Sequence, residues 1–253
     1  MNLPNRRISK QCPVKFYSIL TPLMSAHPPP EEQIRIMNQE TETFLEELKQ
    51  KPEVLGVILF GSWARGNNRP DSDVDLVVIL TNGYKKTVEY KNNQAFEITY
   101  ATEKSAFEYW ESHKDDAAGL WEVAKVLYDK DGTIKQLQEK TQEMLKADKK
   151  PIDEFQLGQF RFDAEDQLKY VESVLDTDPT TANLILTNKV FALTELFFDI
   201  RQLWTPAPKQ RLGKIKEISS GFYSLLQNFY QENIAIKDKL DIARKIIPLV
   251  FEH

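Results

Sequence analysis

The sequence predicts an α/β protein of the α+β kind, in which a mixed β-sheet with flanking helices is followed by an all-α helical bundle. Two short runs rich in branched apolar residues, Val54–Phe60 and Asp73–Leu80, have the length and composition of buried strands. Toward the C-terminus such runs cease, and apolar residues recur at helical spacing instead. We therefore expect a sheet domain over residues 30–150 and a bundle over residues 151–253, joined at the polar segment Asp148–Pro151.

The composition is that of an ordinary globular protein. Of its 253 residues 41% are hydrophobic and 28% charged, and no apolar segment approaches the roughly 20 residues that a membrane span needs. Pro13 and Pro22 interrupt the start of the chain before any adequate apolar stretch, so we expect no secretory leader, no membrane partner and a cytoplasmic location. A single cysteine, Cys12, excludes an intramolecular disulfide and a cysteine-based zinc site.

The first 29 residues are expected to form a flexible basic arm. Residues 1–30 contain four basic residues and no acid, and they end in three consecutive prolines. The whole chain has a formal charge of −5. Because these residues contribute +4, the remainder carries −9. An acidic body argues against stable binding of a nucleic acid, which requires clustered lysine and arginine, and it is compatible with a cationic small molecule.

The elements of the first domain follow from local signals. Pro30-Glu31-Glu32 has the proline and acidic first turn of a helix start, and apolar residues continue at helical spacing until Leu48, so this helix should cover the sheet. Asn92-Asn93 is a hairpin turn signal. The expected elements after the second strand are strands at Thr87–Lys91 and Gln94–Thr102, helices at Glu103–Ser112 and Ile134–Leu145, a loop at Tyr128–Gly132, and mixed signals over Asp115–Val126.

Two apolar stripes predict the central helices of the second domain, and a final helix is expected over Ile236–Val250. The stripes are Phe160, Ala164, Leu168, Val171 and Leu175, and then Leu186, Val190, Leu193, Phe197, Ile200 and Trp204. The second helix also has a polar face with Asn188, Glu195, Asp199 and Gln202. Two interpretations stay open, because buried acids need partners: the acids are neutralised by Arg161, Lys169 or Lys189, or they face a substrate cleft.

Chemistry is concentrated between the two predicted strands. Gly61-Ser62 ends the first strand, and a glycine turn with a hydroxyl lets backbone N–H groups and the side chain approach a phosphate. Asp73 and Asp75 are two apart on a strand, so both carboxylates project from one face. Two such carboxylates repel each other unless a cation lies between them, and Mg2+ prefers oxygen ligands of this kind together with phosphates.

The segments GSWARG and RPDSDVDLVV resemble the signature of the polymerase-beta-like nucleotidyltransferases, in which Gly-Ser is followed by Asp-x-Asp on a strand. The resemblance covers the first domain. Within this superfamily, the sequence is similar to aminoglycoside-type adenylyltransferases and to minimal nucleotidyltransferases. It implies that Gly61, Ser62, Arg65 and Ser72 bind ATP, and that two Mg2+ ions are held by Asp73, Asp75 and a third carboxylate. Family members place this carboxylate between apolar neighbours on a later strand, which favours Glu97 over Glu89 as metal ligand or general base.

The basic segment that begins at Pro206 resembles an element of antibiotic-type nucleotidyltransferases in which a lysine reaches the phosphates. This implies a nucleotide-binding role for Lys209 and, more weakly, for Arg211, whereas the alternative is a solvated helix face. The expected function is transfer of a nucleoside monophosphate, AMP from ATP, to a hydroxyl of a small-molecule acceptor such as an aminoglycoside-like antibiotic. Glu195 and Asp199 are the expected acceptor-binding residues, and either Glu97 or a bundle acid would act as the base.

Two other functional classes fit parts of the same pattern. One is an antitoxin-type nucleotidyltransferase that modifies a partner protein, and the other is a nucleotide-binding regulatory module without catalysis. A fused ribonuclease of the helical HEPN type would need an arginine followed closely by histidine, but the chain has only His27, His113 and His253. The presence of all three carboxylates disfavours the module without catalysis.

Overall fold

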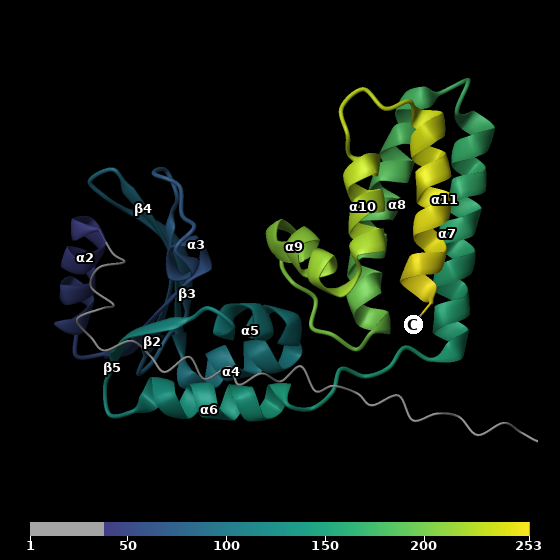
Figure 1. Ribbon diagram of the computed structural model, residues 1–253. Coiled ribbons are helices and arrows are strands. Elements are labelled where there is room, and N and C mark those ends of the chain that lie inside the picture. The colour runs from purple at the N-terminus through teal and green to yellow at the C-terminus, as the bar shows by residue number, and fades with distance from the viewer. Residues whose placement is uncertain (1–37, 253) are drawn as a thin grey trace, which may run out of the picture.

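The computed structural model describes residues 38–252, and a five-stranded mixed sheet organises the first part of the chain (Figure 1). The strand order is β3-β4-β2-β1-β5; β2 pairs with β4 in parallel and all other neighbours pair antiparallel. The strands are β1 Val54–Phe60, β2 Val74–Leu80, β3 Lys85–Lys91, β4 Gln94–Thr102 and β5 Lys125–Asp129. The predicted mixed sheet and its hairpin at Asn92-Asn93 are confirmed.

Helices cover both faces of this sheet, which explains why β1 and β2 are apolar along their length rather than alternating. On one face, α2 (Gln39–Lys49) packs Phe44 and Leu48 onto the sheet. The helices α4 (Glu103–Ser112), α5 (Lys114–Trp121) and α6 (Thr133–Leu145) cover part of the other face, where Ile58, Val77 and Ile79 are buried. The uncovered remainder of this second face carries the acidic residues described below.

One expectation in the first domain needs correction, and another concerns residues that the structure does not describe. The side-chain amide oxygen of Asn38 accepts a hydrogen bond from the Thr41 N–H at 2.9 Å and caps α2, so the described helix begins at Gln39; the start expected at Pro30 lies outside the described residues. Tyr128 and Asp129, predicted to lie in a loop, instead pair with β1 as the last residues of an edge strand. The Asp129 carboxylate also accepts two N–H groups at the start of α6.

The second part of the chain is helical, as predicted, with a core of its own (Figure 1). It comprises α7 Glu154–Val174, α8 Pro179–Ile200, α9 Pro208–Ile218, α10 Ser220–Phe229 and α11 Ile236–Phe251. Most of the predicted stripe residues are buried, but Phe160 is 45% exposed. Gln202 has a φ of 55°, a left-handed conformation that cannot continue a helix, so α8 ends at Ile200 and Trp204 lies beyond it.

The chain passes from α6 to α7 through residues 146–153, which contain the proposed domain linker. The short helix α9 projects from the bundle toward the sheet (Figure 1). No helix within residues 38–252 combines the length and apolar character that crossing a membrane requires.

Candidate active site

Three carboxylates meet on the uncovered part of the sheet. Asp73 directly precedes β2, Asp75 is its second residue, and the parallel register pairs Asp75 with Glu97 on β4. Each side chain offers an oxygen within 4.8 Å of those of the other two. Asp73 is exposed, whereas Asp75 and Glu97 are half-buried. We call Asp73, Asp75 and Glu97 the acidic triad.

The register also decides between the two glutamates that the sequence left as candidates. Strand β3 pairs antiparallel with β4, placing Val88 opposite Glu97 and Glu89 opposite Phe96. Because side chains alternate along a strand, Glu89 lies on the α2 face with Phe96, and its carboxylate accepts a hydrogen bond from the Tyr100 hydroxyl at 3.3 Å. Glu97 alone of the two is on the face that carries Asp75.

The triad contains negative charge that the surrounding protein compensates only in part. The pKa of Asp75 is raised to about 6, first by burial and then by the charges of Asp73 and Glu97, against the opposing effects of Lys209 and Arg65. A divalent cation would relieve this repulsion, and three carboxylates are the oxygen donors that Mg2+ takes. The residues present therefore fit a divalent metal ion.

The position of Asp75 leaves no room for a side chain at Gly61. It ends β1 and begins the five-residue helix α3 (Gly61–Arg65) with a φ of +69°, a region that favours glycine. A Cβ atom at this position would lie 1.7 Å from Asp75 Oδ2, so any side chain would displace the carboxylate. The glycine that the sequence assigned to a phosphate turn is therefore also needed for the position of Asp75.

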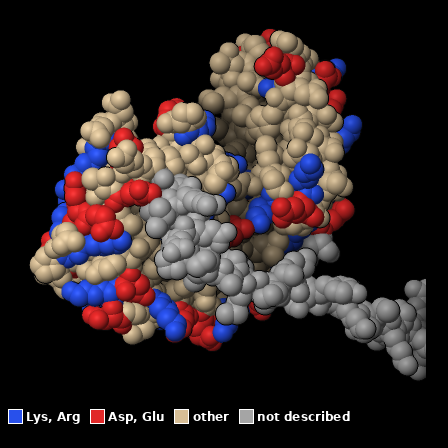
Figure 2. All heavy atoms as spheres, turned by 60° about the vertical axis from the view of Figure 1, so that its left-hand side comes forward, with Lys and Arg blue, Asp and Glu red and all other residues tan. Residues whose placement is uncertain are grey.

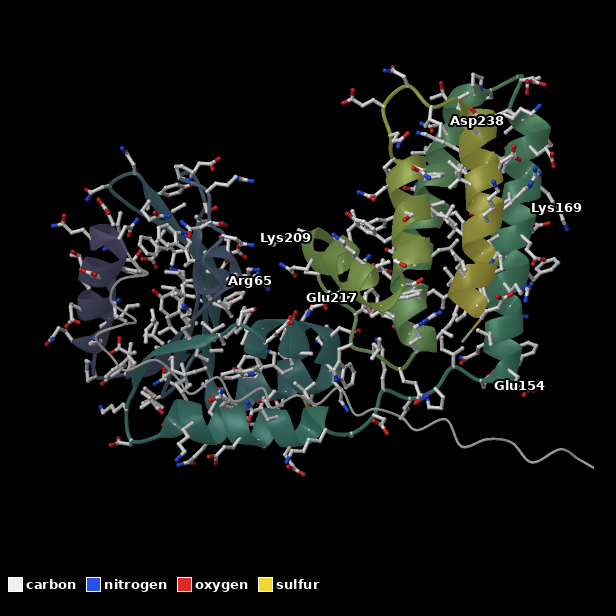
Figure 3. All side chains as sticks on the ribbon, in the orientation of Figure 1. Arg65, Glu154, Lys169, Lys209, Glu217 and Asp238 are labelled. Atoms are coloured by element: carbon white, nitrogen blue, oxygen red, sulfur yellow. The ribbon has the colours of Figure 1, made fainter. Side chains whose placement is uncertain are left out.

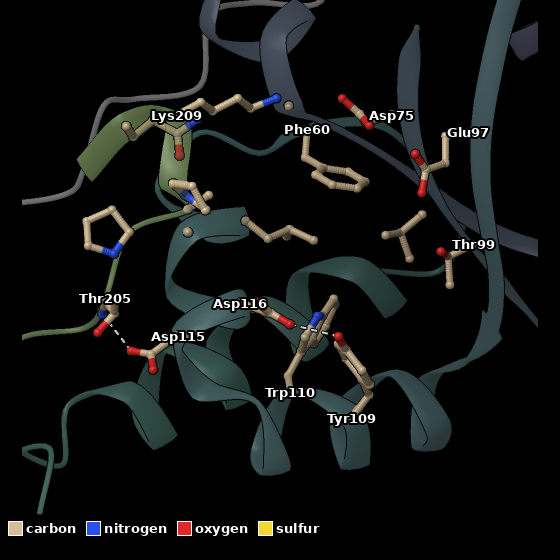
Figure 4. A pocket seen from close by; sticks show the side chains of 18 of the residues that line it. Phe60, Asp75, Glu97, Thr99, Tyr109, Trp110, Asp115, Asp116, Thr205 and Lys209 are labelled. Carbon is tan, nitrogen blue, oxygen red and sulfur yellow. Dashed lines mark hydrogen bonds between the residues drawn. The ribbon is translucent and has the colours of Figure 1, made fainter. Parts of the chain in front are cut away.

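Two members of the triad, Asp75 and Glu97, line a cleft of about 770 Å3 between the sheet and the bundle (Figure 4), whereas Asp73 is not part of its lining. Asp75 and Glu97 project into it from the sheet, and Tyr109, Trp110 and Asp116 form another wall from α4 and α5. The Tyr109 hydroxyl donates a hydrogen bond to Asp116 Oδ2 at 2.7 Å, which raises the pKa of Tyr109 to about 12. The cleft thus combines acidic, aromatic and apolar surfaces.

Two basic residues approach the triad from opposite sides. Arg65 is the last residue of α3, and Lys209 is the second residue of α9 in the bundle (Figure 3). Both line the cleft, and both act electrostatically on Asp75. The structure therefore brings together residues that are far apart in sequence and that the sequence assigned to one nucleotide.

The predicted acceptor-binding acids also line the cleft, but each is paired. Glu195 Oε1 lies 2.8 Å from Arg211 Nη2, and Asp199 Oδ1 lies 2.6 Å from Lys149 Nζ. The basic partners that the sequence suggested are therefore wrong. Arg161 and Lys189 instead form ion pairs with Glu165 and Asp163 within the bundle.

Ser72 has a supporting position outside the cleft lining. Its Oγ accepts the Arg69 N–H at 2.9 Å, and its carbonyl oxygen accepts hydrogen bonds from Trp63 Nε1 and Gln94 Nε2. These bonds shape the loop that leads into Asp73. Ser62 follows Gly61 in the first turn of α3 and likewise is not among the residues that line the cleft.

Sequence reasoning missed two lysines that pair with acids of the cleft. Lys86 forms an ion pair with Glu97, and Lys149 binds both Asp115 on α5 and Asp199 on α8. Strand alternation could have placed Lys86 on the face of Glu97, once the hairpin register was known. No local pattern indicates Lys149, because its partners lie far along the chain in both directions.

Charged side chains are intermixed on the surface shown in Figure 2 rather than gathered into a continuous basic region.

Comparisons with known proteins identify a family and several similar proteins, among them one protein known by sequence and two solved structures. A model of the nucleotidyltransferase domain matches residues 41–171. A putative protein adenylyltransferase of Methanocaldococcus jannaschii is 40% identical over 57 residues, which are 22% of this chain and 39% of that protein. The chain thus spans about two fifths of that relative's length.

Two solved structures share a general similarity. A nucleotidyltransferase-like protein from Exiguobacterium sibiricum has a TM-score of 0.45 at 12% identity, over 85% of this chain and 74% of that chain. Spectinomycin adenyltransferase AAD(9) from Enterococcus faecialis, solved with ATP and spectinomycin, has a TM-score of 0.34 at 13% identity, over 88% of this chain and 99% of that chain.

Proposed function

This chain belongs to the nucleotidyltransferase domain family, and we propose that it transfers AMP from ATP to a hydroxyl group of a small-molecule acceptor. The observation that carries the proposal is the acidic triad at one end of a cleft of about 770 Å3, flanked by Arg65 and Lys209. Such a cleft is large enough for a nucleotide together with an acceptor.

The two ends of the cleft divide the proposed binding roles. Asp73, Asp75 and Glu97 would hold two Mg2+ ions, which when bound stabilise the negative charge of the reacting triphosphate. Arg65 and Lys209 supply positive charge to the phosphates from opposite walls. Gly61 leaves room for Asp75 beside the phosphate path, Ser62 provides a hydroxyl near the turn, and Ser72 acts by holding the loop before Asp73.

The transfer itself is an in-line displacement. The acceptor oxygen forms a bond to the α-phosphorus, the bond from that phosphorus to the oxygen bridging the β-phosphorus breaks, and pyrophosphate leaves with the electron pair. The acceptor proton passes to a carboxylate within reach. Glu97 is the first candidate for this base, because it belongs to the triad; Glu195 is the alternative from the bundle side.

We propose a cationic acceptor, in the manner of an aminoglycoside-like antibiotic. The proposal is supported by Asp116, Glu195 and Asp199 on the cleft lining and by the aromatic rings of Tyr109 and Trp110. Carboxylates bind ammonium groups, and aromatic faces pack on sugar or alicyclic rings while attracting cations. Resistance to such an antibiotic would be the biological consequence.

A protein acceptor is the second candidate. It is favoured by one observation, the 40% identity over 57 residues to a putative protein adenylyltransferase. The antitoxin-type reaction would use the same triad and nucleotide, with a hydroxyl of a protein side chain in place of the small molecule. A regulatory module without catalysis would leave three crowded carboxylates without a purpose.

Incubation of the full chain with α-labelled ATP, Mg2+ and acceptor panels tests these alternatives. One panel contains aminoglycosides and related aminocyclitols, a second contains lincosamides, and a third contains candidate partner proteins. Label that moves to an aminoglycoside, with release of pyrophosphate, supports the proposal, and label on a protein band supports the alternative. The Asp75→Asn variant is the negative control, and pyrophosphate release that persists in it would refute the assignment of the triad.

A further inference from the structure

One triad carboxylate already has a cation. Lys86 Nζ lies 2.7 Å from Glu97 Oε1, and their side chains are 60% and 37% exposed. The pairing follows from the sheet register, in which Lys86 is opposite Thr99 and Val88 is opposite Glu97. Because alternate residues share a face, Lys86 and Glu97 both lie on the cleft side of the sheet, in diagonal positions on neighbouring strands.

The three carboxylates of the triad differ in whether a basic side chain pairs with them. Among residues 38–252, Glu97 is the triad member with an ion pair, whereas Asp73 and Asp75 have none within 4.0 Å. Arg65 and Lys209 act on Asp75 from a longer distance. The Lys86 ammonium group therefore lies next to the position that a divalent cation shared by Asp75 and Glu97 would occupy.

An ammonium group and a divalent cation on one carboxylate repel each other. At about 5 Å this repulsion weakens binding of the divalent cation about 5-fold in water at physiological salt. The lysine side chain is long and mostly exposed, so it is free to leave Glu97 without breaking a packed contact. A bound triphosphate would offer it new anionic oxygens in the same cleft.

We propose that Lys86 is a resident counter-ion of the triad, which competes with the divalent cation for Glu97 and thereby couples metal binding to triphosphate binding. Without nucleotide, a metal ion must separate the Lys86–Glu97 pair or bind against its charge. With nucleotide, the ammonium group has phosphate oxygens as partners and Glu97 is released to the metal. The inference rests on the proposed function, since it assumes that the triad holds a metal and the cleft a triphosphate.

Mn2+ binding to the full chain tests the proposal without any measurement of turnover. The free ion is followed by electron paramagnetic resonance, with and without a non-hydrolysable α,β-methylene analogue of ATP. The variants are Lys86→Met, which removes the charge, Lys86→Arg, which keeps it, and Lys85→Met as the matched control. Lys85 is the preceding residue of β3, is exposed, and alternation places it on the opposite face.

For Lys86→Met we expect Mn2+ alone to bind about 5-fold tighter than in the wild type, from the loss of the repulsion estimated above. The ratio of Mn2+ dissociation constants without and with the ATP analogue should shrink by a similar factor, because the linkage is reciprocal. Lys86→Arg and Lys85→Met should stay within about 2-fold of the wild type in both quantities. Circular dichroism verifies that each variant is folded.

Three results would overturn parts of this scheme, and they are distinguishable. Unchanged or weaker Mn2+ binding in Lys86→Met contradicts the competition, as does an equal change in Lys85→Met. Tighter Mn2+ binding with an undiminished ratio contradicts the coupling. If the wild type and Asp75→Asn bind Mn2+ equally, the triad is not the metal site, and the proposed function loses its basis independently of Lys86.

Discussion

Two groups of carboxylates face the same cleft, and they differ in how their charge is balanced. On the sheet, Asp73, Asp75 and Glu97 offer oxygens within 4.8 Å of one another, with Lys86 as the cation in direct contact. On the bundle, Glu195 and Asp199 each have a basic partner, Arg211 and Lys149. The acids of the bundle are therefore already paired with basic side chains, whereas the charge of the triad is balanced only in part.

The paired acids also have a role in joining the two parts of the molecule. Lys149 Nζ lies 3.0 Å from Asp115 Oδ1 on α5 and 2.6 Å from Asp199 Oδ1 on α8, and Thr205 hydrogen-bonds to both carboxylates. Only 19% of the Lys149 side chain is exposed. This cluster connects the linker, the sheet domain and the bundle beside the cleft.

The largest expected difference between the two groups is in catalysis. Asp75→Asn and Asp73→Asn should each reduce nucleotidyl transfer at least about 100-fold, because they remove ligands for the ions that stabilise the reacting phosphates. Both variants should remain folded, since they relieve repulsion among the acids. Transfer is measured with labelled ATP, and a rate close to that of the wild type in either variant would remove the triad from the mechanism.

The two groups of acids should also differ in which kinetic parameter changes, kcat or the KM of the acceptor. Glu97→Gln should lower kcat by about 100-fold with little change in the KM of the acceptor, as expected for a group that acts on the reacting atoms. Glu195→Gln and Asp199→Asn should mainly raise the KM of the acceptor. If Glu195→Gln instead abolishes turnover while Glu97→Gln is nearly silent, the base belongs to the bundle.

Gly61 and Gly66 allow the geometry of the triad to be tested against a matched control. Both have a positive φ, +69° and +73°, but a Cβ at Gly61 would meet Asp75 while one at Gly66 would meet nothing within 4 Å. Both alanine variants should lose about 1 kcal/mol of stability from backbone strain. Calorimetry with an ATP analogue and Mg2+ should show at least about 10-fold weaker binding for Gly61→Ala alone; equal affinities would mean that Asp75 does not govern nucleotide binding.

The bundle side of the comparison is tested by stability rather than by binding. Lys149→Met removes the cation between Asp115 and Asp199 and should lower the free energy of unfolding by about 1 to 2 kcal/mol, given the partial exposure of these acids. Lys146→Met is the control, since Lys146 forms only an exposed pair with Glu143 and should change stability by less than about 0.5 kcal/mol. Urea unfolding measures both, and similar small losses would mean that the cluster does not stabilise the fold.

The smallest expected effect is the pH dependence that Asp75 imposes on the metal-free protein. Burial and the charges of Asp73 and Glu97 raise the pKa of Asp75 from 3.8 to about 6, so the folded protein binds this proton more tightly than the unfolded chain does. The resulting stabilisation is fully present below about pH 4 and is lost as the pH rises through 6. The stability of Asp75→Asn relative to the wild type should therefore grow by about 1 kcal/mol between pH 4 and pH 7, allowing for partial exposure. Urea unfolding of both proteins at each pH, with chelator present, measures this difference. A difference in unfolding free energy that stays constant between pH 4 and pH 7 would contradict the prediction.

Local patterns were sufficient for most of the sheet domain and for two of the three triad residues. Strands β1 to β4, the hairpin and α4 are specified by neighbouring residues, and Asp73 and Asp75 share a face through strand periodicity alone. Glu97 was identified only with the help of the family resemblance. The register of β3 on β4 then separated it from Glu89 in the structure.

What the sequence did not reveal depends on distant contacts. The partners of Glu195 and Asp199 were misassigned because Arg211 and Lys149 reach them through the packing of α9 and of the linker. Tyr128 and Asp129 carry the signals of a loop, yet β1 provides a free edge with which they pair. Phe160 fits the apolar stripe of α7 by spacing but remains 45% exposed.

The parallel pairing of β2 with β4 has a consequence for how the protein folds. The β3–β4 hairpin is closed by a short turn, but Asp75 and Glu97 become neighbours only after β4 has docked beside β2. Such non-local pairing is generally slow, because chain entropy is lost before the contacts form. The three proposed metal ligands are thus brought together late in folding. A metal ion that needs all three would mainly slow unfolding and would have little effect on the folding rate.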